Sequence, residues 1–336
     1  MFLPEQVFFE PTSLDYPIGE RLYDHFKTTK IPVYMTSEHN RITAFRTLKQ
    51  KDAFMASKRT LVVGVRRSGS FQTCKPSAHY QLPLVTGCPG FCEYCYLSTT
   101  MGPKSYIRLY VNLDQIFEIA QRLIANRSGQ TTVFEGAATS DPIPVEAYTG
   151  ALARAITFFG EQQSARFRFV TKFDEVSSLC PLPHRGHTEI RFSLNPKSVI
   201  QRYEHATASL DRRLMAASQV MHAGYPVGFL IAPVLVYPGW KEQYAELIDR
   251  VRSQLGNAQV SFELVTHRYT HRARQHILSV YPHTKLEMDD AARRFKYGQF
   301  GYGKYVYLPE TMTEIQSFLT NQIQTALPAA KILYMV

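Results

Sequence analysis

The chain has 336 residues, 45% hydrophobic and 20% charged, enough for one large domain with a smaller one, or for two domains with full cores. No apolar run is long enough to cross a membrane, and the first residues lack the basic start and apolar middle of a signal peptide, so we expect a cytoplasmic protein without membrane contact. The formal net charge of +10 indicates an anionic partner, with nucleic acid as the first candidate, although a solvated basic surface without a partner has the same charge.

The first part of the chain, residues 1–78, is expected to form a small N-terminal α/β region. Residues 30–36 and 60–67 are typical of short strands, and the polar stretch 39–58 between them is helix-like. From about residue 80 the pattern becomes regular, and we expect residues 79–270 to form the main unit. Residues 271–336 then form a C-terminal segment.

The main unit is predicted to alternate strands with helices. Six strands are expected, at 80–87, 131–136, 166–172, 189–195, 226–237 and 259–265. Helices are expected from Asn112, where Gln115 has capping-box spacing, and at 145–159, 173–179, 205–222 and 241–255. Each strand–helix unit spans about 30 residues, the size of a βαβ repeat. The fold class is therefore α/β, and a partial (β/α)6 barrel suits the cysteine loop described next better than an open doubly wound sheet.

Polar and ligating residues follow the expected strands. Parallel sheets carry their working residues at the carboxyl ends of the strands, so these residues should converge on one rim. They are Cys88, Cys92, Cys95, Thr139, Ser140, Asp141, Lys172, Ser193, Asn195, His267 and Arg268. We expect a ligand site at this rim.

Three of the five cysteines lie within eight residues, in the segment VTGCPGFCEYCYLSTT. Structural zinc takes four ligands, whereas three thiolates suit a four-iron cluster that leaves its fourth iron open to a ligand. Three unliganded cysteines are the remaining alternative. Cys74 and Cys180 stand alone in the sequence and are expected to be buried small side chains.

The C-x3-C-x2-C motif, with Tyr94 before the last cysteine, resembles the radical S-adenosylmethionine superfamily. The longer segments GCPGFCEYCYLSTT and FEGAATSDPIPVE, with FVTK and RFSLN, are similar to the spore photoproduct lyase family over most of the chain. The likeness is weakest in the first 75 residues and the C-terminal tail. It implies a radical S-adenosylmethionine partial barrel, a 4Fe-4S cluster and S-adenosylmethionine. It also implies a 5′-deoxyadenosyl radical that takes hydrogen from a 5-thyminyl-5,6-dihydrothymine lesion in ultraviolet-damaged DNA, so that two thymines are restored.

The resemblance also implies roles for individual residues. Cys88, Cys92 and Cys95 would bind the cluster, and Tyr94 would lie against the adenine of S-adenosylmethionine. The ribose and methionine ends would be held by three polar side chains, Ser140, Lys172 and Ser193. Glu135 and Gly136 stand where many superfamily members have an intact Gly-Gly-Glu run, which this chain lacks.

Two tyrosines and one alanine concern the return of the hydrogen atom. Tyr94 and Tyr96 would relay it, although both could be packing aromatics in a chain with 20 tyrosines. The family's hydrogen-donor cysteine corresponds to Ala138, whose methyl group does not donate readily. We expect an altered variant that closes its cycle badly, unless the donor lies elsewhere.

The segment RRFKYGQFGYGKYVY, residues 293–307, combines basic residues, aromatic rings and glycines. This composition favours a β-hairpin that contacts distorted DNA through charges and rings, although the rings could also pack on the core. The expected DNA contacts are Arg268, Arg294, Lys296, Tyr302, Lys304 and Tyr305.

Two other functions fit parts of the pattern. One is a radical S-adenosylmethionine enzyme that acts on RNA or a small molecule, and the other is a non-enzymatic zinc-bearing nucleic-acid-binding module. For the favoured function we expect a monomer in the cytoplasm of the spore core, with a flavodoxin or ferredoxin as electron donor.

Overall fold

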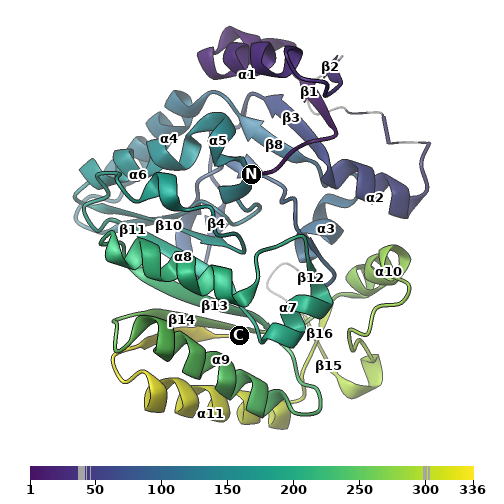
Figure 1. Cartoon of the computed structure of the whole chain (residues 1–336), viewed down its shortest axis with the longest axis vertical. Helices are drawn as coiled ribbons and strands as arrows, with labels where there is room; N and C mark the ends of the chain where they lie inside the picture. Colours follow the sequence, from purple (N-terminus) through teal and green to yellow (C-terminus); the bar gives the residue numbers. More distant parts are fainter. Residues whose placement is uncertain (37–41, 43, 46, 298–300, 302) are drawn as a thin grey trace.

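The computed structural model describes residues 1–36, 42, 44, 45, 47–297, 301 and 303–336. An eight-stranded sheet curls through the molecule as an open half-barrel (Figure 1). Its strands, in spatial order, are β17 (Lys331–Met335), β14 (Ser261–Thr266), β13 (Val227–Val234), β11 (Thr188–Leu194), β10 (Ala165–Thr171), β9 (Thr132–Glu135), β5 (Ala78–Gln81) and β4 (Thr73–Cys74). Neighbouring strands are parallel except for β4 and β5. Five of the six expected strands are present as neighbours, as β9, β10, β11, β13 and β14, and the α/β class is confirmed.

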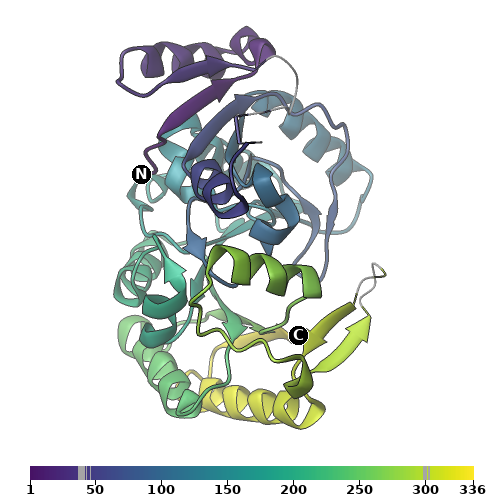
Figure 2. The same cartoon turned by 90° about the vertical axis from the view of Figure 1, so that its right-hand side faces the viewer.

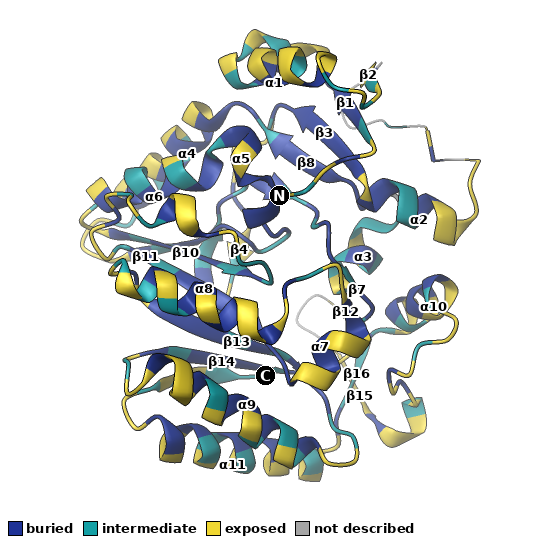
Figure 3. Cartoon of the chain, viewed as in Figure 1, coloured by how far each residue is buried: buried dark blue, intermediate teal, exposed yellow. Residues whose placement is uncertain are grey.

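The two faces of this sheet differ in chemistry. Along β10 and β11, Phe167, Phe169 and Phe192 are buried among helix side chains, while the alternate residues Arg168 and Arg191 point to the opposite face. The outer face is covered by the long helices α4 (Leu113–Ala125), α6 (Ala151–Glu161), α8 (Leu210–His222), α9 (Trp240–Leu255) and α11 (Pro309–Ala326), whose buried sides face the sheet (Figure 3). The inner face thus carries polar side chains such as Arg168 and Arg191, and these side chains are nevertheless buried.

A second, five-stranded sheet stands beside the half-barrel. Its order is β2 (Val33–Met35), β1 (Gln6–Phe9), β3 (Thr60–Gly64), β8 (Ile107–Tyr110) and β6 (Val85–Thr86), with α1 (Pro17–Lys27) and α2 (Gln50–Lys58) from the same N-terminal region. The expected strands at 30–36 and 60–67 correspond to β2 and β3. The single strand expected at 80–87 is wrong, because β5 ends at Gln81 and β6 pairs in the other sheet.

Shorter elements complete the fold. They are α3 (Tyr96–Met101), α5 (Glu146–Thr149), α7 (Lys197–Tyr203), α10 (His271–Val280), the strands β7 (Phe91–Cys92), β12 (Glu204–His205), β15 (Arg294–Tyr297) and β16 (Gly303–Val306), and 3-10 turns at Pro11–Asp15, Gly102–Lys104, Ile143–Val145, Ser177–Leu179 and Asp290–Ala292. The antiparallel strands β7 and β12 pair, as do β15 and β16. Figure 2 shows α10 lying against α2 and α3, so the C-terminal segment meets the N-terminal region.

Several helix predictions need correction. The helix expected at 145–159 is two helices, because Gly150 adopts a left-handed φ of +64° between them. The helix expected at 39–58 begins only at Gln50, and residues 37–41, 43 and 46 lie outside the described part. The helix expected at 205–222 begins only at Leu210, as α8. The helix expected at 173–179 is only a 3-10 turn at Ser177–Leu179. Asn112 caps α4, but its side-chain amide donates to the Gln115 side chain at 2.6 Å instead of forming a capping box.

Two further features concern the whole chain. The sheet continues past the strand expected at 259–265, because α11 packs on α9 and returns the chain to the sheet edge, where β17 pairs with β14. Within the described residues, no helix combines the length and apolarity needed to span a bilayer.

Candidate functional site

The cysteine loop lies between β6 and α3, above the carboxyl ends of the half-barrel strands. Cys92 belongs to β7, which pairs with β12 through Cys92 and Glu204, and the backbone of Glu93 donates to Tyr203 at 2.9 Å. Gly87 forms a bridge with Ser140 after β9, and the backbone N–H of Gly90 donates to the Cys88 sulfur at 3.4 Å. Strand pairing thus anchors the loop to the sheet rim where the sequence places it.

The three cysteines of this loop differ in exposure, because Cys92 is buried while Cys88 and Cys95 are partly buried. Burial raises the pKa of Cys88 to about 12, while Lys58 opposes this rise, and burial also raises the pKa of Cys92. Binding to a metal would displace these protons. Among the described residues, no group of three His, Cys, Asp or Glu side chains is arranged to hold a single metal ion. Three thiolates suit a four-iron cluster with one open iron better than structural zinc, which takes four ligands.

A buried carboxylate, Glu204, organises the floor beneath the loop. Its side chain is fully buried and forms ion pairs with Lys172 at 2.9 Å and with Arg213 at 2.7 Å. The phenol of Tyr94 donates to the same carboxylate, and the amide of Asn195 donates to it at 3.2 Å. Burial alone would raise the pKa of Glu204, but the two cations outweigh burial and lower the pKa to about 2. The carboxylate is therefore charged throughout the physiological range.

Three residues expected to hold S-adenosylmethionine lie around this floor. The Lys172 ammonium reaches the Tyr94 hydroxyl at 3.2 Å as well as Glu204. Ser193 is 3% exposed, and its hydroxyl oxygen has no hydrogen-bond partner among the described residues. Ser140 is also buried and makes only a long contact of 3.5 Å to the Gly136 carbonyl. Buried hydroxyls without good partners are unusual, and they fit a polar ligand in this space.

Asp141 stands beside Lys172 without touching its ammonium. The carboxylate accepts hydrogen bonds from the Thr171 hydroxyl at 2.8 Å and from the Lys172 backbone N–H at 2.8 Å. Burial raises the pKa of Asp141 to about 6, although these hydrogen bonds counteract the rise. Asp141 therefore fixes the chain after β10 and aims Lys172 at the site.

Tyr94 and Tyr96 point in different directions. Burial first, and then the Glu204 carboxylate, raise the pKa of Tyr94 well above its usual value, so its phenol keeps its proton. Tyr96 is 64% exposed, and its hydroxyl donates to the backbone carbonyl of Ala138 at 3.2 Å. The structure thus brings Tyr96 to position 138 and Tyr94 to the acidic floor.

The inner face of the sheet carries an ion-pair network below the rim. Glu263 binds Arg168 and Arg191, each at 2.6 Å, and Arg191 also pairs with Glu135. The Ser77 hydroxyl donates to Glu135 at 3.1 Å. The Glu135 carboxylate is therefore already engaged by protein groups, in line with the interrupted Gly-Gly-Glu run.

The predicted DNA-contacting residues gather around β15 and β16. Arg268, Arg294 and Lys296 are exposed, and Lys304 lies partly exposed on β16. Burial lowers the pKa of Lys304, and the positive charges of Arg268 and Lys296 lower it further. These basic groups therefore form one positive patch.

The aromatic rings of this segment divide between packing on the protein and exposure to solvent. Tyr305 stacks on Tyr269 with ring centroids 5.4 Å apart, as the packing alternative expects. Phe295 and Tyr297 are exposed. Tyr302 lies outside the described residues.

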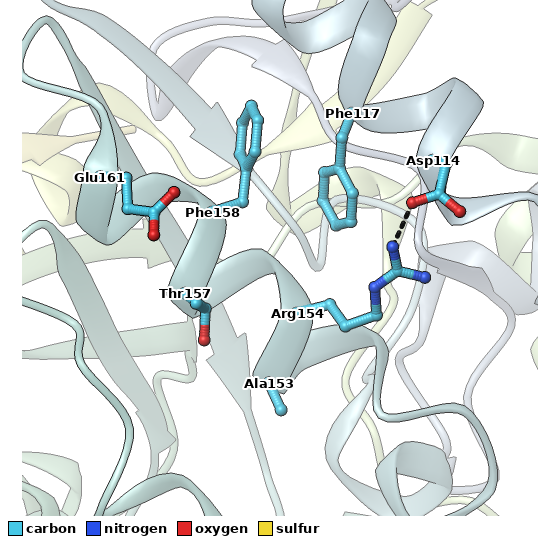
Figure 4. Close-up of a pocket in the computed structure, with 7 residues that line it drawn as sticks. All are labelled: Asp114, Phe117, Ala153, Arg154, Thr157, Phe158 and Glu161. Atoms are coloured by element: carbon cyan, nitrogen blue, oxygen red, sulfur yellow. Dashed lines mark hydrogen bonds and ion pairs between the residues drawn. The ribbon is translucent and has the colours of Figure 1, made fainter.

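Sequence reasoning missed Glu204, Arg213 and Lys58 as site residues. Glu204 and Arg213 follow no strand of the sheet and belong to no motif, and Lys58 lies 30 positions before Cys88. The surface depression in Figure 4 does not belong to this site. It lies between α4 and α6 on the outer helical layer, where Asp114 and Arg154 form an exposed ion pair.

Comparison with known proteins gives one consistent family. The family model described as spore photoproduct lyase matches residues 2–336. The chain is 48% identical over 331 residues to spore photoproduct lyase of Clostridium acetobutylicum, covering 98% of each chain. It is 41% identical over 336 residues to that of Bacillus subtilis, covering 99% of this chain and 98% of the relative.

Solved structures agree with this result. A mutant spore photoproduct lyase with bound AdoMet and dinucleoside spore photoproduct has a TM-score of 0.97 at 43% identity, covering 100% of this chain and 99% of the other. A spore photoproduct lyase complexed with dinucleoside spore photoproduct has the same TM-score at 42% identity and the same coverage.

Proposed function

Because the chain belongs to the spore photoproduct lyase family, we infer that it is a DNA repair lyase that reverts spore photoproduct, 5-thyminyl-5,6-dihydrothymine, to two thymines. The observation that carries this function is the full-length similarity to a structure with bound AdoMet and the dinucleoside lesion. S-adenosylmethionine is the cofactor, and the substrate is a lesion in DNA.

We propose that Cys88, Cys92 and Cys95 hold a 4Fe-4S cluster whose open iron binds S-adenosylmethionine. When bound, the cluster supplies the electron that cleaves this cofactor and starts radical chemistry. The three cysteines lie on one short loop, with Cys92 buried and Cys88 and Cys95 partly buried, which supports the assignment. The radical must form next to its target and away from water, which a site beneath this loop provides.

The chain's own residues hold and orient the cofactor. Lys172 supplies an ammonium for a carboxylate, and Ser140 and Ser193 supply hydroxyls that lack good protein partners. Glu204 holds Lys172 and the Tyr94 phenol in fixed positions, which supports a place for Tyr94 at the cofactor. Asp141 fixes the backbone on which Lys172 is carried.

The source of the returned hydrogen atom is open to two hypotheses. The first is the expectation from the sequence that Ala138, whose carbonyl accepts a hydrogen bond from the Tyr96 hydroxyl, stands in place of a donor cysteine and leaves the enzyme impaired. Cys74 offers a second hypothesis. It lies partly buried on β4 near Glu135, and burial, with a smaller contribution from Glu135, raises its pKa to about 12. The thiol therefore stays protonated, which is the form that gives up a hydrogen atom.

The other isolated cysteine is less well placed. The Cys180 thiol contacts the Val176 carbonyl at 3.7 Å, next to a 3-10 turn, and it packs against the hydrophobic core on the outer side of the sheet. If the chain carries its own donor, Cys74 is the candidate that faces the site. In that case the S–H hydrogen atom would move to the product radical, and a tyrosine O–H hydrogen atom would move to the resulting thiyl radical. The tyrosyl radical left behind would take a hydrogen atom from 5′-deoxyadenosine, which closes the cycle.

We propose that the positive patch of Arg268, Arg294, Lys296 and Lys304 contacts the DNA phosphates beside the lesion. The enzyme acts as a monomer in the cytoplasm of the spore core, with a flavodoxin or ferredoxin as electron donor. Lifting the linked thymines out of the stack is easier for a damaged site than for an intact one.

One experiment tests the function and the donor together. Reduced, reconstituted protein is incubated anaerobically with S-adenosylmethionine and lesion-bearing dinucleotide, and restored thymine is measured. The expected result is consumption of the lesion, with clean repair if Cys74 is the donor and with few restored thymines if the chain lacks a donor. An untouched lesion in the presence of cofactor cleavage would contradict the proposed substrate. Cys74→Ser should abolish clean repair in the first case and change nothing in the second. Ala138→Cys should then restore repair, with Ala138→Ser as the size-matched control.

A further inference from the structure

Lys58, the last residue of α2, is a charged side chain buried against the cysteine loop. The residue is 3% exposed, and its Nζ donates a hydrogen bond of 2.5 Å to the backbone carbonyl of Cys88. The ammonium also lies 5.8 Å from the ring centroids of Phe54 and Phe91, which help to exclude water. The N-terminal region thus places a full positive charge beside the first cysteine.

Among the residues that the structure describes, this charge has no carboxylate partner. Within the described ranges, no carboxylate forms an ion pair with Lys58, and the Cys88 carbonyl is its hydrogen-bond acceptor. Other buried cations in the molecule are neutralised, as Arg191 is by Glu135 and Glu263, and Arg213 by Glu204. Burying an unpaired charge is unfavourable unless an opposite charge lies nearby. The position of Lys58 therefore calls for an anion at the cysteine loop.

We propose that Lys58 is the counter-ion of the cysteine-bound cluster and raises its reduction potential. The inference rests on the proposed function, because it takes a 4Fe-4S cluster as the anion. Three thiolates leave such a cluster with net negative charge, and one added electron makes it more negative. A fixed positive charge in a water-poor site stabilises the reduced form more than the oxidised form, and net charge and exposure set the potentials of such clusters.

The hydrogen bond to the Cys88 carbonyl holds the ammonium at the backbone of the first cysteine. A positive charge beside a cysteine favours the thiolate that the cluster needs over the thiol. The same residue would promote both cluster loading and cluster reduction, and this assigns a role in the chemistry to the N-terminal region.

The test compares three variants after anaerobic reconstitution, without substrate. Lys58→Met removes the charge and keeps most of the side chain, Lys58→Arg keeps the charge, and Lys51→Met removes an exposed charge from the same helix. Bound iron is counted, and the cluster is titrated with reductant while its electron paramagnetic resonance signal is followed. We expect Lys58→Met to lower the ratio of reduced to oxidised cluster about tenfold at fixed potential, a shift of about 59 mV, and Lys51→Met to match the wild type.

Each result decides the question. A loaded Lys58→Met variant with the wild-type potential would overturn the inference. If Lys58→Met cannot hold the cluster while Lys58→Arg and Lys51→Met can, the result would support the role of the Lys58 charge. If Lys58→Arg also fails to hold the cluster, the result would overturn the inference, because only the packing of the lysine would then matter. Wild-type protein that takes up no cluster would overturn the proposed cofactor, and the inference with it.

Discussion

Removing the charge of Glu204 is expected to destabilise the whole site, and the effect should depend on pH. Glu204→Gln keeps the size of the side chain and an oxygen that accepts the Tyr94 hydrogen bond, but it leaves Lys172 and Arg213 without their carboxylate. A pKa lowered from 4.5 to about 2 corresponds to roughly 3 kcal/mol of folding free energy at neutral pH. The loss of one partner from a buried ion pair, about 3–5 kcal/mol, agrees with this figure.

The pH dependence follows from the direction of the shift. The pKa of Glu204 is lower in the folded chain than in the unfolded chain, so its contribution is complete above about pH 4.5 and is lost as the pH falls toward 2. Urea unfolding should therefore show a large gap between wild type and Glu204→Gln at pH 7 and a smaller gap at pH 3. Asp114→Asn, which breaks the exposed pair with Arg154, is the control and should cost about 0–1 kcal/mol. A gap below about 1 kcal/mol at pH 7, or one that is constant from pH 7 to 3, would refute the account of Glu204.

Two further predictions concern the cluster and the DNA. Single replacement of Cys88, Cys92 or Cys95 with alanine should abolish cleavage of S-adenosylmethionine and leave the circular dichroism spectrum unchanged, and 5′-deoxyadenosine formed by any of the three variants would contradict the cluster assignment. Lys304→Ala should weaken binding of lesion DNA and reduce the slope of log affinity against log salt by about one phosphate contact, whereas an unchanged slope would return this segment to a purely structural role.

The sequence was sufficient for the sheet because hydrophobic alternation and βαβ spacing are local signals. Five of the six strands expected from those signals are parallel neighbours in the half-barrel. Its edges were not foreseen, since β4 is only two residues long and β17 follows a helix that periodicity reasoning passed over. The break of 80–87 into two strands did have a local signal, since Pro83 lies between the halves that pair in different sheets, but the strand prediction passed over it.

Function was more predictable than the site's geometry. The extended cysteine motif led to the family, and the full-length family match rules out the zinc-bearing module and the RNA or small-molecule enzyme that charge and cysteine count left open. The residues that position the site could not be found in the same way. Glu204 and Arg213 act through burial and pairing, and both properties depend on contacts between segments that are distant in sequence.

Three separate parts of the chain hold the cysteine loop in place. The cysteine motif identifies the chemistry of the loop, but the residues that support the loop lie outside the motif. The half-barrel holds the loop through the pairing of Cys92 with Glu204, and the N-terminal region holds it through Lys58. The C-terminal segment contributes the Tyr281 hydroxyl, which donates to the Phe91 carbonyl at 3.1 Å. A reactive cofactor must stay fixed while a large DNA substrate enters and leaves. Supports from three separate parts of the chain therefore leave the loop little freedom to move, whatever motion the rest of the rim makes.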